Sequence, residues 1–137
     1  MADQIVLRVP PREVVVKVVD DVEVADPSVG QTGTFDDELF DEDGKLIGTS
    51  HGSFRIEYVR PGDGGLLTYY TEDITLDDGT IHAEGWADFN DVRTSEWVHY
   101  PATGTGGRYE GGLRGFRTWR MTGGVRASAE ARILLSD

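Results

Sequence analysis

The sequence contains few side chains that could act as nucleophiles or metal ligands. It has three histidines and no cysteine, which excludes disulfides, zinc–thiolate sites, iron–sulfur clusters and thiol nucleophiles. His51, His82 and His99 fall on separate expected strands, without H-x-H or HExxH spacing. We therefore expect each of them to be a surface or core histidine, and we expect no metal site.

Sequence motifs of nucleophilic catalysis and phosphate binding are also absent. There is no G-x-S-x-G and no recognisable Ser-His-Asp order, and the glycine-rich run 104–107 lacks the lysine of a P-loop. The acidic stretch 36–43 lacks the ligand spacing of an EF-hand and is interpreted as a solvated hairpin. Chemistry based on a nucleophile or a metal therefore has little support.

Aromatic side chains are more informative. Five of them lie on five different expected strands: Phe35, Tyr70, Phe89, Tyr100 and Trp119. In the segment 115–121, a period of two places Arg117, Trp119 and Met121 on one face. Turned inward, that face would bring a cation and a large aromatic ring into the interior, which suits a ligand pocket. A buried arginine needs a partner, and Glu13 is a candidate. The alternative is a plain aromatic core with Arg117 at its mouth.

Glycine-centred turns divide the chain into short segments that can position these residues. Between the turns, apolar and polar residues alternate, as in 54–59 and 127–135. The predicted strands lie near 13–22, 33–40, 46–59, 66–76, 80–89, 94–100, 113–122 and 125–135. We expect no amphipathic helix. Eight antiparallel strands joined by hairpins can close into an up-and-down β-barrel of the lipocalin-like kind, and we predict this all-β fold.

Small residues on two expected strands indicate a lumen that holds a ligand. One face of each strand carries them: Ala83, Gly85 and Ala87 beside Phe89, and Ala127, Ala129 and Ala131. Small residues that point inward leave volume for larger side chains or for a ligand, and we favour the ligand over a filled core. The connection Val22–Thr32 is longer than a hairpin turn. It is interpreted either as a lid or as a plain surface connection.

Charge and composition limit the partners. The formal net charge of −12 argues against nucleic acid or an anionic membrane, because phosphate binding depends on an excess of lysine and arginine. A length of 137 residues with 38% hydrophobic residues is typical of one soluble domain. Charged residues interrupt every apolar run near the N-terminus, so we predict no signal peptide or membrane span and a cytoplasmic chain. We divide it into an N-terminal extension, 1–12, and a single barrel domain, 13–137.

Several segments carry a resemblance to a known family. The stretches GTFDDELFDEDGKLIG and YPATGTGGRYEGG resemble the allene oxide cyclase and dirigent barrel superfamily. The chain is still more similar to the spirotetronate cyclases of abyssomicin-type biosynthesis, from about Val14 to Leu135. This closer similarity is carried by VVVKVVDDVEVADPSVGQ, FRIEYVRPGDGGLLTYYTEDITLDDG, IHAEGWADFNDVRTSEWVHYPATG and GFRTWRMTGGVRASAEARILL.

The resemblance implies a fold, a reaction and a set of site residues. The fold is a homodimer of eight-stranded barrels, each with an apolar pocket and no cofactor. The reaction is an intramolecular [4+2] (Diels–Alder) cycloaddition of a linear tetronate polyketide. In it, the exocyclic methylene of the tetronate adds to a conjugated diene. The family's pocket aromatics match the five named above, with Met121 beside them, and its gating ion pair matches Glu13 and Arg117.

These matches lead to specific expectations for the site. Trp119 is expected to pack on the tetronate, and Tyr70 to donate a hydrogen bond to a tetronate carbonyl, which makes the dienophile more electron-poor. The pair Glu13–Arg117 is expected to close the mouth. Two other functions stay open. One is an allene oxide cyclase-like enzyme that acts on an epoxide. The other is a non-catalytic barrel that binds a hydrophobic metabolite or serves as a dirigent-like scaffold.

Overall fold

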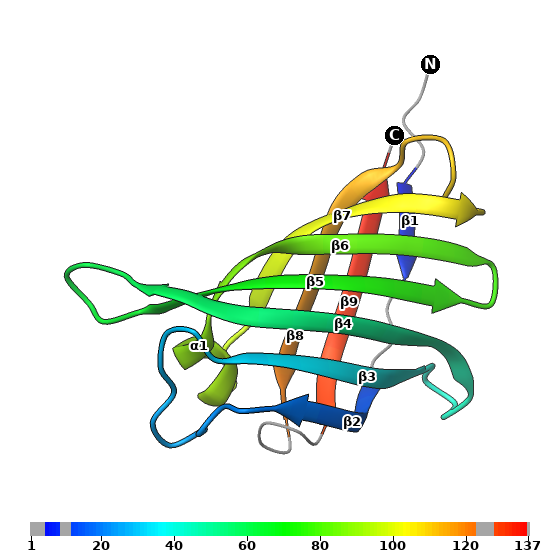
Figure 1. Ribbon diagram of the computed structural model, residues 1–137. Helices are drawn as coiled ribbons and strands as arrows, with labels where there is room; N and C mark the ends of the chain where they lie inside the picture. Colours follow the sequence, from blue (N-terminus) through cyan, green and yellow to red (C-terminus); the bar gives the residue numbers. More distant parts are fainter. Residues whose placement is uncertain (1–4, 9–11, 123–127, 137) are drawn as a thin grey trace.

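The structure is a computed structural model that describes residues 5–8, 12–122 and 128–136 (Figure 1). Within these residues the chain forms antiparallel strands and one short helix. The elements are β1 (Ile5–Arg8), β2 (Arg12–Asp20), β3 (Thr32–Phe40), β4 (Leu46–Val59), β5 (Leu66–Leu76), β6 (Gly79–Asp88), α1 (Phe89–Arg93), β7 (Val98–Gly107), β8 (Arg114–Met121) and β9 (Ser128–Ser136).

The strands form one closed sheet. Each of β2 to β9 pairs with its neighbour in sequence, and β9 also pairs with β2, which completes a ring of eight (Figure 1). The predicted eight-stranded antiparallel barrel is confirmed. The ninth strand, β1, falls within the predicted N-terminal extension. It pairs with the end of β9, where Ile5 lies opposite Ser136, while β2 pairs with the start of β9, where Glu13 lies opposite Ala129.

The segment between β6 and β7 differs from the prediction. A strand was expected to include Phe89 and the next to begin at residue 94. Instead, Phe89–Arg93 form α1, which begins where the Asp88 carboxylate accepts a hydrogen bond of 2.9 Å from the backbone N–H of Asn90. β7 begins at Val98 and continues through the glycine-rich segment to Gly107. A helix of five residues is too short to show an amphipathic repeat in the sequence.

Small residues line the inside of the barrel as expected. Ala83 and Ala87 are buried, and so are Ala129 and Ala131, whereas Ala127 lies outside the described residues. At two glycines, an aromatic residue of the neighbouring strand occupies the space that a side chain would need. A Cβ at Gly85 would lie 2.6 Å from Cβ of Tyr100, and one at Gly52 would lie 2.5 Å from Cζ of Phe35. Glycine on one strand therefore makes room for an aromatic ring on the next.

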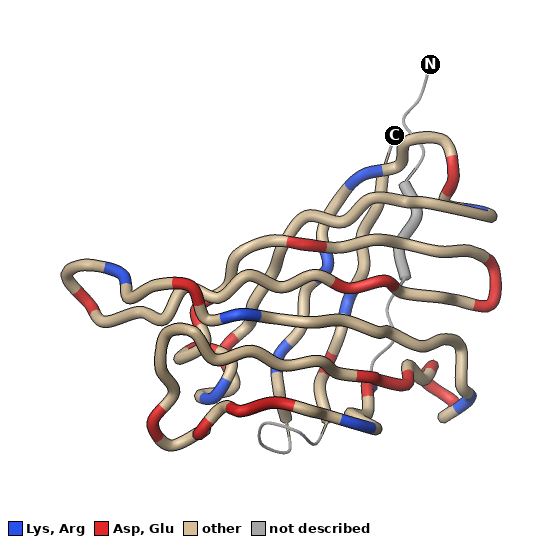
Figure 2. The backbone as a smooth tube through the Cα atoms, in the orientation of Figure 1, with Lys and Arg blue, Asp and Glu red and all other residues tan. Residues whose placement is uncertain are grey.

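The barrel is filled at one end. Aliphatic side chains near the hairpins β3–β4 and β5–β6 and near the end of β9 are fully buried: Leu39, Ile74, Ile81, Ile133 and Leu135. The other end is covered by the loop 21–31 and by α1 (Figure 1). Acidic residues are spread over many strands and hairpins, so the charge of −12 is not concentrated in one place (Figure 2). None of the helices in the described part of the chain is long and apolar enough to cross a membrane.

Candidate functional site

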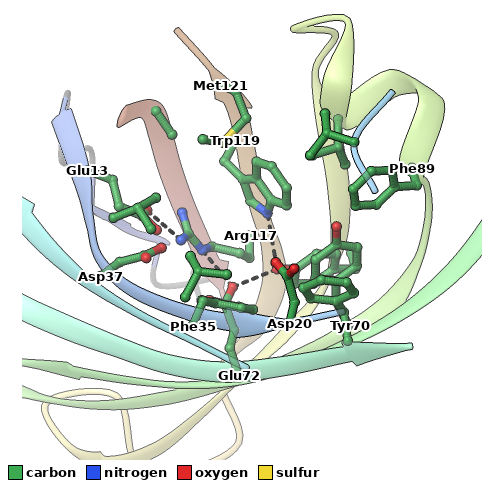
Figure 3. A pocket seen from close by; sticks show the side chains of 17 residues that line it. Glu13, Asp20, Phe35, Asp37, Tyr70, Glu72, Phe89, Arg117, Trp119 and Met121 are labelled. Atoms are coloured by element: carbon green, nitrogen blue, oxygen red, sulfur yellow. Dashed lines mark hydrogen bonds and ion pairs between the residues drawn. The ribbon is translucent and has the colours of Figure 1, made fainter. Parts of the chain in front are cut away.

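A cavity of about 80 Å³ lies inside the barrel, below the loop 21–31 and α1 (Figure 3). It is lined by all eight side chains singled out from the sequence: Glu13, Phe35, Tyr70, Phe89, Tyr100, Arg117, Trp119 and Met121. The structure therefore brings together residues that are up to 108 positions apart, from Glu13 to Met121. The roles assigned to them stay predictions.

Nine further residues line the same cavity: Val15, Val18, Asp20, Val24, Asp37, Phe54, Glu72, Val92 and Ala129. Ala129 was expected to face the lumen, whereas sequence reasoning did not select the other eight, although the period of two contains the signal for some. Asp37 alternates inward with Phe35 and Leu39, and Glu72 alternates inward with Tyr70. Asp37 was interpreted as part of a solvated hairpin, and this interpretation is wrong because the residue is only 7% exposed.

Tyr70 is the centre of an aromatic wall. Its ring stacks on Tyr100, with centroids 5.8 Å apart and planes at 11°, and on Phe54 at 5.4 Å and 30°. Trp119 meets it edge-on at 5.7 Å, and Phe35 lies 6.4 Å away. Offset and edge-to-face pairs of this kind fix ring orientations beyond simple burial. The wall presents flat, apolar surfaces to the cavity.

The hydroxyl of Tyr70 is available to a ligand. It has no hydrogen-bond partner among the described residues, although the side chain lines the cavity and the residue is 4% exposed. Burial, aided by the charge of Glu72, raises the pKa of Tyr70 above its ordinary value, so the hydroxyl stays protonated near neutral pH. Tyr70 can therefore donate a hydrogen bond into the cavity.

The polar atoms of Trp119 and Tyr100 are used within the protein. Nε1 of Trp119 donates to the Tyr100 hydroxyl at 3.0 Å, and that hydroxyl donates to Oε1 of Glu72 at 2.8 Å (Figure 3). The same Oε1 accepts from Nε of Arg117 at 2.8 Å, and Oε2 accepts from the hydroxyl of Ser50 at 2.5 Å. All of these residues are buried. One hydrogen-bond chain thus connects the indole to the guanidinium.

Arg117 points inward, as predicted for the face that it shares with Trp119 and Met121, and it is 1% exposed. Its Nη2 donates to Oε1 of Glu13 at 2.5 Å, which forms the predicted ion pair, and Glu72 is a second carboxylate partner. Burial alone would lower the pKa of Arg117, but the charges of Glu13 and Glu72 outweigh it and raise that pKa. The guanidinium is therefore a permanent cation between two carboxylates, deep in the barrel. The gating role of the pair stays a prediction.

Asp37 is a neutral acid beside this ion pair. Burial, a hydrogen bond to Glu13 and the negative charge of Glu13 raise the pKa of Asp37 to about 10. Desolvation acts in the same direction on Glu13, but the charge of Arg117 and the hydrogen bond from Asp37 overcome it and lower the pKa of Glu13. Two neighbouring carboxyl groups thus have opposite protonation states: Asp37 holds the proton and Glu13 carries the charge.

The histidines lie away from the cavity. His51 contacts Asp36 at 2.6 Å, and His82 contacts Asp73 and Glu84 at 2.8 Å each, on the outer surface. In the described part of the chain, no group of three or more His, Asp or Glu side chains has an arrangement that could hold a metal ion.

Comparisons with known proteins give the family. The model of the allene oxide cyclase barrel like domain matches residues 13–135, so this chain belongs to that family. No curated protein sequence matches the chain.

Three solved structures are similar over nearly the whole chain. AbnU, described as an exo-specific intermolecular Diels–Alderase, is 45% identical with a TM-score of 0.92, and each chain covers 100% of the other. The Diels–Alderase AbmU from Streptomyces koyangensis is 28% identical with a TM-score of 0.85. A nonspecific heme-binding cyclase that catalyses [4+2] cycloaddition during neoabyssomicin biosynthesis is 29% identical with a TM-score of 0.83. The last two matches cover 96% of this chain but only 63% and 64% of the other chains. The resemblance to cyclases of abyssomicin-type biosynthesis is confirmed.

The cavity of this chain does not fit a haem. Haem iron is held by His, Cys or Tyr, or by Met together with His. Among the described residues that line the cavity there is no His, and the chain has no Cys. The Tyr100 hydroxyl is bonded to Glu72, and the cavity of about 80 Å³ beside Tyr70 is too small for a haem.

Proposed function

We propose that this protein is a Diels–Alderase that catalyses a [4+2] cycloaddition of a linear tetronate polyketide. One observation carries the proposal. Eight residues matched to the pocket of such cyclases surround a single apolar cavity, in a chain that is 45% identical over its full length to a Diels–Alderase. In this reaction the exocyclic methylene of the tetronate adds to a conjugated diene at the far end of the same molecule.

The protein contributes confinement and orientation. A pericyclic reaction proceeds without a nucleophile once diene and dienophile meet in a reactive geometry. Holding reacting groups in such a geometry can lower a barrier by several kcal/mol, up to about 10. The aromatic wall of Tyr70, Tyr100 and Trp119 provides rigid surfaces for this purpose, since its rings pack against one another. Trp119 packs on the tetronate in this proposal.

Tyr70 supplies the polar contribution. In our proposal, its unpaired hydroxyl donates a hydrogen bond to a tetronate carbonyl, which withdraws electrons from the dienophile as the new bonds form. Support comes from the contrast with Tyr100, whose hydroxyl is already bonded to Glu72 and Trp119. Of the two stacked tyrosines, Tyr70 is the one whose hydroxyl has no partner among residues 5–8, 12–122 and 128–136 and can bond a substrate.

Substrate binding requires the cover to move. A cavity of about 80 Å³ is well below the roughly 300 Å³ or more of most ligand pockets. Val24 of the loop 21–31 and Val92 of α1 both line it, and Nη1 of Arg93 donates to the carbonyl oxygen of Val24 at 3.3 Å. We therefore propose that this loop and α1 form a lid, and that Glu13 and Arg117 gate the cavity beneath it.

The assembly and the conditions of the reaction follow from the family resemblance. We propose that the protein acts as a homodimer, without a cofactor, in the cytoplasm. Light scattering of the purified protein tests the first statement, because a dimer has twice the mass of the 15.1 kDa chain. Activity after exhaustive dialysis against a chelator tests the second.

A conversion assay tests the function. Purified protein is incubated with a linear exomethylene tetronate that carries a diene, and the mixture is separated by chromatography and mass spectrometry. We expect an isomer of unchanged mass to form faster than it does without protein. Tight binding without conversion would support a hydrophobic-metabolite carrier, and conversion of an epoxide fatty acid alone would support an allene oxide cyclase-like enzyme.

A second candidate is an intermolecular cycloaddition, which the description of AbnU favours. The same assay separates the two when the diene and the exomethylene tetronate are supplied as separate molecules. Faster adduct formation from the separate molecules than from the tethered substrate would favour the intermolecular reaction.

A further inference from the structure

Glu72 is a buried carboxylate whose two oxygens are both used within the protein. It lies in β5 between Tyr70 and Ile74, and its side chain is 0% exposed. Oε1 accepts from Tyr100 and Arg117 at 2.8 Å each, and Oε2 accepts from Ser50 at 2.5 Å. Three hydrogen bonds from protein groups thus occupy both oxygens, and Glu72 acts on the cavity through these partners and through its charge, which also reaches Tyr70.

The contact with Tyr100 fixes the direction of its hydroxyl. A tyrosine has a single O–H proton, and in Tyr100 this proton is donated to Glu72. The oxygen is then left as an acceptor, and Nε1 of Trp119 donates to it at 3.0 Å. The chain of bonds therefore has one direction, from the indole of Trp119 through Tyr100 to the carboxylate.

The same carboxylate controls the orientation of the wall that a substrate would touch. The ring of Tyr100 stacks on Tyr70 at 5.8 Å and 11°, and Trp119 meets Tyr70 at 5.7 Å and 72°. Glu72 also holds Arg117 through Nε, while Glu13 holds it through Nη2. Loss of the carboxylate would remove the acceptor that orients the Tyr100 hydroxyl beneath the indole, and one of the two carboxylate partners of Arg117.

We propose that Glu72 is the positioning residue of this site. Its carboxylate orients the Tyr100 hydroxyl, thereby holds the indole of Trp119 in place, and anchors Arg117 on the side away from Glu13. The effect of Glu72 on the reaction rests on the proposed function, whereas its effect on Trp119 does not. The two can therefore be measured separately.

The first readout is the indole N–H resonance of Trp119 in the NMR spectrum, assigned by its loss in Trp119→Phe. Tyr100→Phe removes the acceptor, so the resonance should shift toward that of an unbonded indole. Glu72→Gln should shift it in the same direction by a smaller amount, because a neutral amide oxygen holds the Tyr100 hydroxyl less strongly than a carboxylate. Ser50→Ala is the matched control. It removes a bond to the other oxygen of the same carboxylate and should leave the resonance in place.

The second readout is the reaction. Glu72→Gln and Tyr100→Phe should each lower kcat about tenfold or more, with a smaller change in KM, since small misplacements of catalytic groups cost up to about 100-fold. The product diastereomer ratio should move toward that of the uncatalysed reaction. The effects of the two changes should be less than additive in the double variant, because both break the bond between Tyr100 and Glu72, while only Glu72→Gln also affects Arg117.

Unchanged indole resonance and product ratio in folded Glu72→Gln would overturn the proposal. If that variant does not fold, Glu72→Asp takes its place. Aspartate keeps the charge but is one methylene shorter, so the indole resonance and the product ratio should both change, and the absence of both changes would likewise overturn the proposal. An indole shift in a protein that converts no tetronate would leave the positioning role intact and contradict the proposed function instead.

Discussion

At the scale of single residues, most polar groups of the pocket form hydrogen bonds with other protein groups, and few are left for a ligand. Trp119, Tyr100 and Arg117 direct their hydrogen bonds to other residues of the protein. Tyr70 lies among them with a protonated hydroxyl that has no partner in the described part of the chain. The site therefore resembles a rigid aromatic cup in which, among the described residues, the Tyr70 hydroxyl and Nη1 of Arg117 are donors without a protein partner.

Tyr70→Phe tests this donor. The variant keeps the ring and its stacking, and because no protein group loses a hydrogen bond, its free energy of unfolding should change by less than about 0.5 kcal/mol. The cycloaddition rate should fall about tenfold, which corresponds to about 1.4 kcal/mol of barrier. Tyr69→Phe is the control, since Tyr69 points outward and bonds Glu84. Equal rates for Tyr70→Phe and the wild type would leave Tyr70 only a role in pocket shape.

Asp37→Asn tests the buried neutral acid through the pH dependence of stability. The folded pKa of about 10 lies above the ordinary value of 3.8, so between these values the folded state binds more protons than the unfolded state. Stability contributed by the protonated form is therefore present at low pH and lost as pH rises. Asparagine keeps a donor toward Glu13 and does not titrate.

The stability of Asp37→Asn relative to the wild type should therefore increase between pH 5 and pH 8. The increase is at most about 4 kcal/mol, because each pH unit contributes about 1.4 kcal/mol. Urea unfolding curves at several pH values measure it, and the other titrating groups cancel in the difference. Parallel pH profiles of the two proteins would mean that Asp37 is ionised in the folded state.

The residues that sequence reasoning identified and missed have a common physical explanation. Alternation along β8 places Arg117 on one face with Trp119 and Met121, but only the family resemblance indicated that this face points inward. The alternation along β3 places Asp37 on the inward face, and that along β5 does the same for Glu72. A carboxylate in an acidic chain is nevertheless ordinarily solvated. Only the three-dimensional structure shows that one cation serves several buried acids. Phe54 escaped attention because nothing in the sequence distinguishes an inward phenylalanine of the core from one of a pocket.

At the scale of elements, the cover of the cavity consists of a loop and a helix joined by few bonds. The loop 21–31 is bonded to β4, where the N–H of Gly30 donates to the carbonyl of Ile56 at 2.8 Å. In the same loop, the carbonyl oxygen of Val24 accepts a hydrogen bond from Arg93 of α1. In the opening that we propose, the loop moves away from α1, so the contact between Val24 and Arg93 breaks while the anchor on β4 can persist.

Arg93→Ala should make this opening easier. A hydrogen bond of about 0.5–1 kcal/mol corresponds to a two- to fivefold change in an equilibrium. We expect substrate uptake or product release, measured by stopped-flow fluorescence, to become faster by about this factor. Arg55→Ala is the control, because Arg55 is an exposed arginine of β4 that contacts Glu57 and not the cover. Identical kinetics in Arg93→Ala and the wild type would exclude this contact as a latch.

The elements themselves were predictable to different degrees. The bounds predicted for β4 and β5 agree with the structure, because both strands alternate regularly between two clear turns. The start of β7 was predicted too early, because the cap formed by Asp88 begins a helix that interrupts the alternation. β1 was not predicted, since its pairing partner lies at the other end of the chain.

At the scale of the whole molecule, closure between β8 and β9 depends on close backbone approach. A Cβ at Gly115 would overlap the carbonyl oxygen of Leu134 on the neighbouring strand. Gly115→Ala should therefore force the two strands apart and lower the free energy of unfolding by about 3 kcal/mol or more. Gly44→Ala is the control. A Cβ there meets nothing, so only the positive φ of 79° costs about 1–2 kcal/mol. Equal losses in thermal unfolding would show that β8 and β9 tolerate separation.

The central claim is that the closed aromatic cavity directs a [4+2] cycloaddition. The most direct measurement is the diastereomer ratio of the adduct formed from a linear exomethylene tetronate diene, with and without the protein. We predict faster conversion to an isomer of unchanged mass, with one diastereomer in excess over the uncatalysed mixture. An unchanged mixture formed at the uncatalysed rate would contradict it.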